Sequence, residues 1–98
     1  MYTLHIEHPI SDLATWKAAF DRDPVDRAGS GVRHYVIHQP VDDPQYVHVD
    51  LDFDTAQESH AFLASMAAVW SSASAAPALR GTPQTSILAL VESSDVLA

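Results

Sequence analysis

The stretch from Gln45 to Phe53, Gln-Tyr-Val-His-Val-Asp-Leu-Asp-Phe, constrains the fold more than any other part of the chain. Its apolar and polar residues alternate without interruption, a pattern typical of a β-strand whose two faces meet different surroundings. The apolar face consists of Val47, Val49, Leu51 and Phe53. The polar face consists of Tyr46, His48, Asp50 and Asp52. We therefore expect the amphipathic segments on either side of this strand to cover its apolar face, and the polar face to meet water or a polar cavity.

Three further segments have the alternation of strands. They are Tyr2 to His8, Val32 to Gln39 and Thr85 to Glu92. The second of them alternates Tyr35 and Ile37 with His34, Val36 and His38. The proline and aspartate residues over Pro40 to Pro44 predict a hairpin turn between this strand and the strand over Gln45 to Phe53.

Two segments have the period of amphipathic helices. The first covers Asp12 to Arg22, with Ser11 or Asp12 as its N-cap, and its apolar stripe is Leu13, Trp16 and Phe20. The second begins at the capping box Thr55-Ala-Gln-Glu58, and its stripe is Phe62, Leu63, Met66, Val69 and Trp70. The run from Ala73 to Leu79 has the composition of a short further helical piece.

The predicted order of elements is β-α-β-β-α-β, which is the ferredoxin-like split arrangement of the α+β class. Right-handed crossovers place the strands over residues 2–8 and 45–53 side by side at the centre of a four-stranded antiparallel sheet, with both helices on one face. We expect residues 1–92 to form a single domain and residues 93–98 to be a flexible C-terminal tail. The face away from the helices would present Thr3, His5, Glu7, Tyr46, His48 and Asp50.

The charge of the chain argues against anionic partners. Thirteen acidic residues outnumber five basic ones and give a formal net charge of −8, so we expect no nucleic acid and no membrane partner. The absence of cysteine excludes disulfides and thiolate chemistry. No basic segment followed by an apolar one opens the sequence, which predicts no signal peptide and a cytoplasmic location.

A cluster of histidines and carboxylates is the candidate site. His5 and His48 are predicted on the same face of the two central strands, and Glu7 and Asp50 follow them at the next position on that face. Neighbours on adjacent strands lie about 4.5–5.5 Å apart, so a carboxylate can fix the tautomer of an imidazole and tune it for proton transfer. These four are the candidate catalytic residues. The candidate ligand-binding residues are His34, His38 and Tyr46.

Three interpretations of this cluster stay open: a solvated or interfacial sheet face, a ligand or substrate pocket, and a metal site. Two or three histidines with one carboxylate suit zinc or iron, but no local motif such as HExxH is present, and we predict no metal and no cofactor. The histidines elsewhere are weaker candidates. His60 is expected to be exposed, and His8, at a strand end before Pro9, is expected to cap the sheet edge.

The segments Tyr2-Thr-Leu-His-Ile-Glu-His and Tyr46-Val-His-Val-Asp-Leu-Asp-Phe, with a second helix broken before a proline-containing connection, resemble the dimeric α+β barrel proteins. Within that superfamily the chain looks most like the small antibiotic-biosynthesis-monooxygenase-like proteins, over about residues 1 to 92. The resemblance implies that two sheets pack with their non-helical faces together and close a barrel around a small cavity. Oxygenases and haem-degrading members of the superfamily use an asparagine, which this chain lacks, so no catalytic residue is carried over.

Two functions follow as hypotheses. The first is a small-molecule enzyme or ligand-binding protein that uses a polar, histidine-lined cavity inside a homodimeric barrel. The resemblance implies monooxygenase- or cyclase-like action on a small apolar, aromatic or polyketide-type compound. The alternative is a non-catalytic dimeric interaction or ligand-sensing module with a filled barrel. The volume of the barrel cavity discriminates between them.

Overall fold

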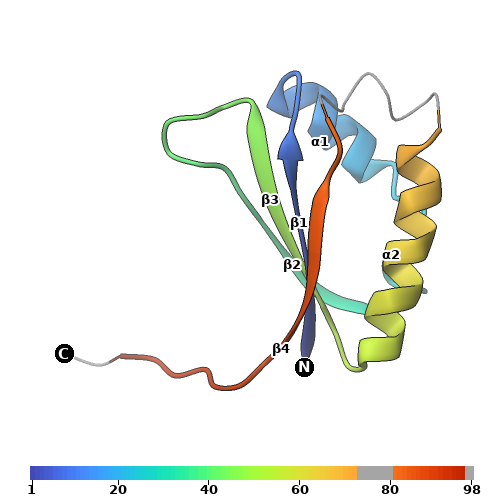
Figure 1. Cartoon of the computed structure of the whole chain (residues 1–98), viewed down its shortest axis with the longest axis vertical. Helices are drawn as coiled ribbons and strands as arrows, with labels where there is room; N and C mark the ends of the chain where they lie inside the picture. The colour runs from blue at the N-terminus through green and yellow to red at the C-terminus, as the bar shows by residue number, and fades with distance from the viewer. Residues whose placement is uncertain (73–80, 97–98) are drawn as a thin grey trace.

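The computed structural model describes residues 1–72 and 81–96. Its elements are β1 (Tyr2–Pro9), α1 (Leu13–Asp21), β2 (Val32–His38), β3 (Tyr46–Phe53), α2 (Ala56–Trp70) and β4 (Gln84–Ala89). The four strands form one sheet and both helices lie on the same side of it (Figure 1). The ferredoxin-like βαββαβ arrangement predicted from the sequence is thereby confirmed. The short helical piece predicted over residues 73–79 lies outside the described residues.

The sheet has the strand order β2-β3-β1-β4, and every neighbouring pair is antiparallel. The predicted central pair, β1 and β3, is confirmed. Its register places Leu4 opposite Leu51 and His5 opposite Asp50. Because side chains alternate along a strand, this register gathers the apolar residues of both central strands on one face and their polar residues on the other.

The core lies between the sheet and the helices. Its buried apolar residues are Leu4, Ile6, Ile10, Trp16, Val47, Val49, Leu51, Phe53 and Phe62. The predicted stripe of α1 is only partly buried: Trp16 is in the core, whereas Leu13, at the first turn of the helix, is 40% exposed.

Both helices begin at the caps predicted from the sequence. The carboxylate of Asp12 accepts a hydrogen bond from the backbone N–H of Thr15 at 2.7 Å. The hydroxyl oxygen of Thr55 accepts one from the N–H of Glu58 at 3.1 Å. Each bond satisfies a donor that the first helical turn leaves without a partner. Neither helix, within the residues that can be described, is long and apolar enough to cross a membrane.

The last strand ends earlier than the predicted Glu92. Ala89 pairs with Tyr2, the first residue of β1, and the N–H of Leu90 donates to the carbonyl of Met1 at 3.0 Å. After Leu90 the chain leaves the sheet and extends away from it (Figure 1).

The two faces of β3 predict unequal costs for substitutions at adjacent positions. Leu51→Ala should lower the free energy of unfolding by about 2–5 kcal/mol, because a buried side chain is removed and the space is only partly refilled. Asp52→Asn should cost less than about 1 kcal/mol, because the amide oxygen can still accept a hydrogen bond. Urea unfolding midpoints measure both. Equal decreases of the two urea midpoints would contradict the assignment of Leu51 to the buried face and of Asp52 to the polar face.

Candidate functional site

The candidate site lies on the sheet face turned away from the helices, which we call the open face. Strand register assigns to it Thr3, His5 and Glu7 of β1, Tyr46, His48, Asp50 and Asp52 of β3, His34, Val36 and His38 of β2, and Gln84, Ser86 and Leu88 of β4. All seven candidate residues predicted from the sequence are therefore on one face. The structure joins five of them in a continuous polar network.

His5 is the centre of this network. Its Nδ1 lies 2.6 Å from Oδ1 of Asp50, and its Nε2 lies 2.7 Å from Oε2 of Glu7. Both contacts are hydrogen bonds to carboxylates only when both ring nitrogens carry a proton, so they favour the imidazolium form. The hydrogen bond that His5 donates to Glu7 is the largest cause that raises the pKa of His5 above its ordinary value. Partial burial opposes this rise, and the hydrogen bond to Asp50 adds to it.

Glu7 is shared by three side chains. Its Oε1 accepts a hydrogen bond from the hydroxyl of Tyr46 at 2.8 Å, and its Oε2 lies 3.4 Å from Nδ1 of His48. The hydrogen bond with His5, followed by that from Tyr46, lowers the pKa of Glu7 below its ordinary value. The same carboxylate raises the pKa of the Tyr46 hydroxyl, because a phenolate there would face a negative charge.

The period of the strands and their register explain why these groups meet. His5 and Glu7 are two residues apart on β1 and so share a face. Asp50 stands opposite His5, and His48 stands opposite Glu7. His5 and His48 are diagonal neighbours, and their ring centroids are 5.6 Å apart, closer than the roughly 7–8 Å typical of diagonal positions.

The two histidines of β2 lie at the margin of the network. Nδ1 of His34 is 3.4 Å from Oδ2 of Asp52, and Oδ1 of Asp52 accepts a hydrogen bond from the Thr3 hydroxyl at 2.6 Å. His38 stands opposite His48 in the register. Within residues 1–72 and 81–96, no hydrogen bond or ion pair connects His38 to the other members of the cluster.

Three of the side chains converge closely enough to hold one metal ion. One ligand atom each from His5, Glu7 and His48 lies within 4.8 Å of the other two. Two histidines with one carboxylate is a combination that the sequence left open as a metal site, although we predicted no metal because no local motif is present.

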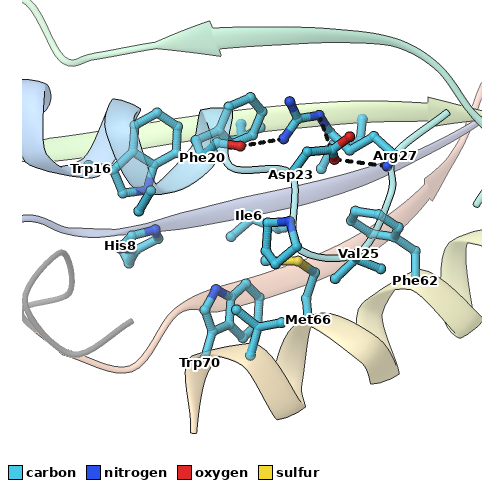
Figure 2. Close-up of a pocket in the computed structure, with 15 residues that line it drawn as sticks. Ile6, His8, Trp16, Phe20, Asp23, Val25, Arg27, Phe62, Met66 and Trp70 are labelled. Carbon is cyan, nitrogen blue, oxygen red and sulfur yellow. Dashed lines mark hydrogen bonds and ion pairs between the residues drawn. The ribbon is translucent and has the colours of Figure 1, made fainter. Parts of the chain in front are cut away.

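A cavity of about 80 Å³ lies on the opposite side of the sheet, between the strands and the helices (Figure 2). Its lining includes Ile6, His8, Trp16, Phe20, Met66 and Trp70. The prediction that His8 caps the sheet edge was wrong, since this side chain is only 2% exposed. Its Nδ1–H donates to the carbonyl of Pro9 at 3.0 Å, and burial lowers the pKa of the ring. Its alternation with Leu4 and Ile6 was the signal that could have placed it inside.

The loop between α1 and β2 contributes to the wall of this cavity. Nη1 of Arg27 donates to the carbonyl of Phe20 at 2.7 Å, and the guanidinium lies 4.0 Å from the centroid of the Phe20 ring. The carboxylate of Asp23 accepts a hydrogen bond from the N–H of Arg27 at 2.9 Å. Figure 2 shows these contacts at the rim, where they fix the loop against α1.

Comparison with known proteins confirms the fold. No family model and no curated protein matches the chain. Among solved structures, a "putative antibiotic biosynthesis monooxygenase" from Deinococcus radiodurans superposes with a TM-score of 0.63 at 14% identity over 100% of both chains. A dimeric ferredoxin-like protein from an uncultured marine organism has a TM-score of 0.63 at 11% identity, over 95% of this chain and 97% of that one. The ActVA-Orf6 monooxygenase of Streptomyces coelicolor, solved with the ligand nanaomycin D, has a TM-score of 0.65 at 14% identity, over 95% and 89%. At such identities the likeness shows a shared ferredoxin-like fold.

The contacts of His5 predict its titration. In chelator-treated protein its imidazole should titrate above 6.5, the ordinary value. Glu7→Gln and Asp50→Asn should each lower the pKa of His5, and Glu7→Gln should lower it more, because the Glu7 hydrogen bond is the largest cause. NMR titration of the imidazole protons measures this.

The same shifts fix the sign of the pH dependence of stability. The raised pKa of His5 contributes stability that is fully present below pH 6.5 and is lost as the pH rises through the folded-state value. The lowered pKa of Glu7 contributes stability that is fully present above pH 4.5 and is lost as the pH falls through its folded-state value. The contact therefore stabilises the fold most between pH 4.5 and 6.5. If His5 titrates at its ordinary value in the wild type, in Glu7→Gln and in Asp50→Asn, the network does not persist in solution.

Proposed function

We propose that two copies of this chain pack their open faces together into a barrel, and that the His5 cluster acts there on a small, largely apolar compound. The observation that carries the proposal is the imidazole of His5 held between Glu7 and Asp50, at 2.7 and 2.6 Å. An imidazole fixed in this way on a sheet face that its own chain leaves uncovered is suited to exchange a proton with a bound molecule.

The open face has the composition of a surface that is covered in an assembly. Leu88 is 50% exposed there, and Leu90, just beyond β4, is 58% exposed. Packing against a second copy would bury both and would enclose the polar network between two sheets. The dimeric ferredoxin-like protein among the similar structures supports this arrangement by its fold.

The roles of the side chains follow from their contacts. His5 and His48 would transfer protons, with Glu7 and Asp50 as the partners that set their charge. The candidate ligand-binding residues His34, His38 and Tyr46 would orient the compound. A monooxygenase- or cyclase-like reaction on an aromatic or polyketide-type molecule is the activity that the resemblance favours, in a cytoplasmic setting and without a nucleic-acid partner. A non-catalytic module with a filled barrel is the alternative.

The cavity on the helical side of the sheet supports a second candidate site. It is lined mostly by apolar side chains and has the buried imidazole of His8 as a polar group. Its volume of about 80 Å³ is below the roughly 300–1,000 Å³ typical of small-molecule pockets. A compound of aromatic size would therefore enter only if the loop held by Arg27 moved.

The dimer is tested by its mass in solution. Light scattering at micromolar concentration should return twice the mass of one chain for the wild type. Leu88→Asp should return the monomer mass, because it adds a charge to the face that pairs. Leu13→Asp changes a leucine of α1 that is 40% exposed, against 50% for Leu88, and should leave the dimer intact. A monomeric wild type would contradict the assembly.

Proton abstraction is tested with 1,8-dihydroxyanthrone, whose carbanion reacts with O₂ to give the anthraquinone and water. The protein should accelerate oxygen uptake, and His5→Gln should reduce the acceleration by at least about 100-fold, the lower range for general acid–base catalysis. His60→Gln, an exposed position on α2, is the matched control and should have no effect.

One further variant separates the two candidate sites. Ala19 lines the helix-side cavity, so the larger side chain of Ala19→Leu should fill part of this cavity and leave the open face unchanged. Loss of oxygen uptake in Ala19→Leu but not in His5→Gln would assign the activity to the helix-side cavity and not to the open face. No acceleration by the wild type, together with a filled barrel in a crystal of the dimer, would favour the non-catalytic module.

A further inference from the structure

We propose that His5, Glu7 and His48 bind one divalent first-row transition metal ion, such as Zn²⁺ or Fe²⁺, on the open face. The inference goes beyond the proposed function and rests on it only for the closed barrel around the ion. With the ion bound, His5 and His48 are ligands, and they transfer protons only in the metal-free protein. All three ligands belong to one chain, so the ion itself needs a single protomer.

The positions of the three ligand atoms match a metal site. Nε2 of His5 is 2.7 Å and Nδ1 of His48 is 3.4 Å from the same atom, Oε2 of Glu7, and all three lie within 4.8 Å of one another. Metal–ligand bonds of about 2.1 Å separate neighbouring ligand atoms by roughly 3.0–3.4 Å in octahedral or tetrahedral geometry. An ion can therefore reach all three with small side-chain movements.

A second, independent observation concerns the atoms that would not touch the ion. Nδ1 of His5, the nitrogen away from the site, lies 2.6 Å from the Asp50 carboxylate. Oε1 of Glu7, the oxygen away from the site, accepts the Tyr46 hydrogen bond at 2.8 Å. Metal-binding histidines and carboxylates characteristically have such partners, which fix the tautomer and orientation of the ligand. Here each partner is bonded to the atom that coordination leaves free.

The charges and the ligand types select the kind of ion. Two carboxylates, those of Glu7 and Asp50, lie on either side of His5. The open-face residues named above include no lysine or arginine, and the chain has a net charge of −8. The charge of the site therefore favours a bound cation. Two imidazoles with one carboxylate suit Zn²⁺ or Fe²⁺, whereas Mg²⁺ and Ca²⁺ prefer oxygen ligands.

The proposal departs from the expectation of no metal, which relied on the lack of a local motif. Two residues at i and i+2 on one strand and a third on its neighbour form a group that only the register brings together. Three protein ligands leave coordination positions open toward the interior of the proposed barrel. An oxygen atom of a small molecule could bind there.

The test is calorimetric titration of Zn²⁺ into chelator-treated, full-length protein, with the visible absorbance of Co²⁺ as a second readout. One ion should bind per chain. His48→Gln and Glu7→Gln should each weaken binding by at least about 10-fold, and Asp50→Asn by about 10–100-fold, as is typical when the partner of a ligand is lost. His60→Gln should bind as the wild type does.

Two results would overturn the proposal: no saturable binding of either ion, or binding that survives unchanged in His48→Gln and Glu7→Gln. Circular dichroism checks that each variant folds. If His48→Gln or Glu7→Gln does not fold, the affinity measured for Asp50→Asn decides the test. The Leu88→Asp protein should still bind the ion, because one chain supplies all three ligands, but it should not accelerate oxygen uptake, because its barrel is open. Metal binding by a wild type whose metal-free form does not accelerate oxygen uptake would contradict the function alone. Oxygen uptake by a wild type that binds no metal would contradict the metal site alone.

Discussion

The antiparallel pairing of β1 with β3 is the constraint on which the rest of the molecule depends. One register sends Leu4 and Leu51 into the core and His5 and Asp50 to the open face. A shift by a single residue would exchange the faces. It would place carboxylates under the helices without partners, at a cost of several kcal/mol for each buried charge. The hydrophobic core thus enforces the register, and the register in turn assembles the polar network.

The open face collects negative charge that must be balanced before a second layer can cover it. Glu7, Asp50 and Asp52 lie within two strands, and water at present screens them in part. Enclosure between two sheets would remove that water, which strengthens each favourable contact and raises the cost of every carboxylate left without a partner. Two copies would bring two such sets into one interior. Neutralisation, by imidazolium or by a bound cation, is therefore a condition for closing the barrel.

Periodicity predicted the faces of the strands, and the handedness of the crossovers predicted the central pair. Together they predicted the common face of His5, Glu7, His48 and Asp50. They could not predict that His5 engages both carboxylates, because that depends on side-chain rotamers. The end of β4 depends on where β1 begins, a relation between segments about eighty residues apart that no local pattern contains. The helix-side cavity arises from the packing of two helices and a loop against the sheet. The error over His8 had a different cause: the proline after it was given more weight than the alternation before it.

The separation of the two faces also determines how such a chain can diverge in evolution. On β1 and β3 the residues of the core and the residues of the candidate site alternate. An inherited change at His5 or His48 leaves no void in the core, so a lineage can replace the candidate site while it keeps the scaffold. Many enzymes trade stability against activity because one side chain must serve both. In this architecture that conflict is relieved by geometry, so that new reactivity can arise on the open face while selection for folding acts on the other.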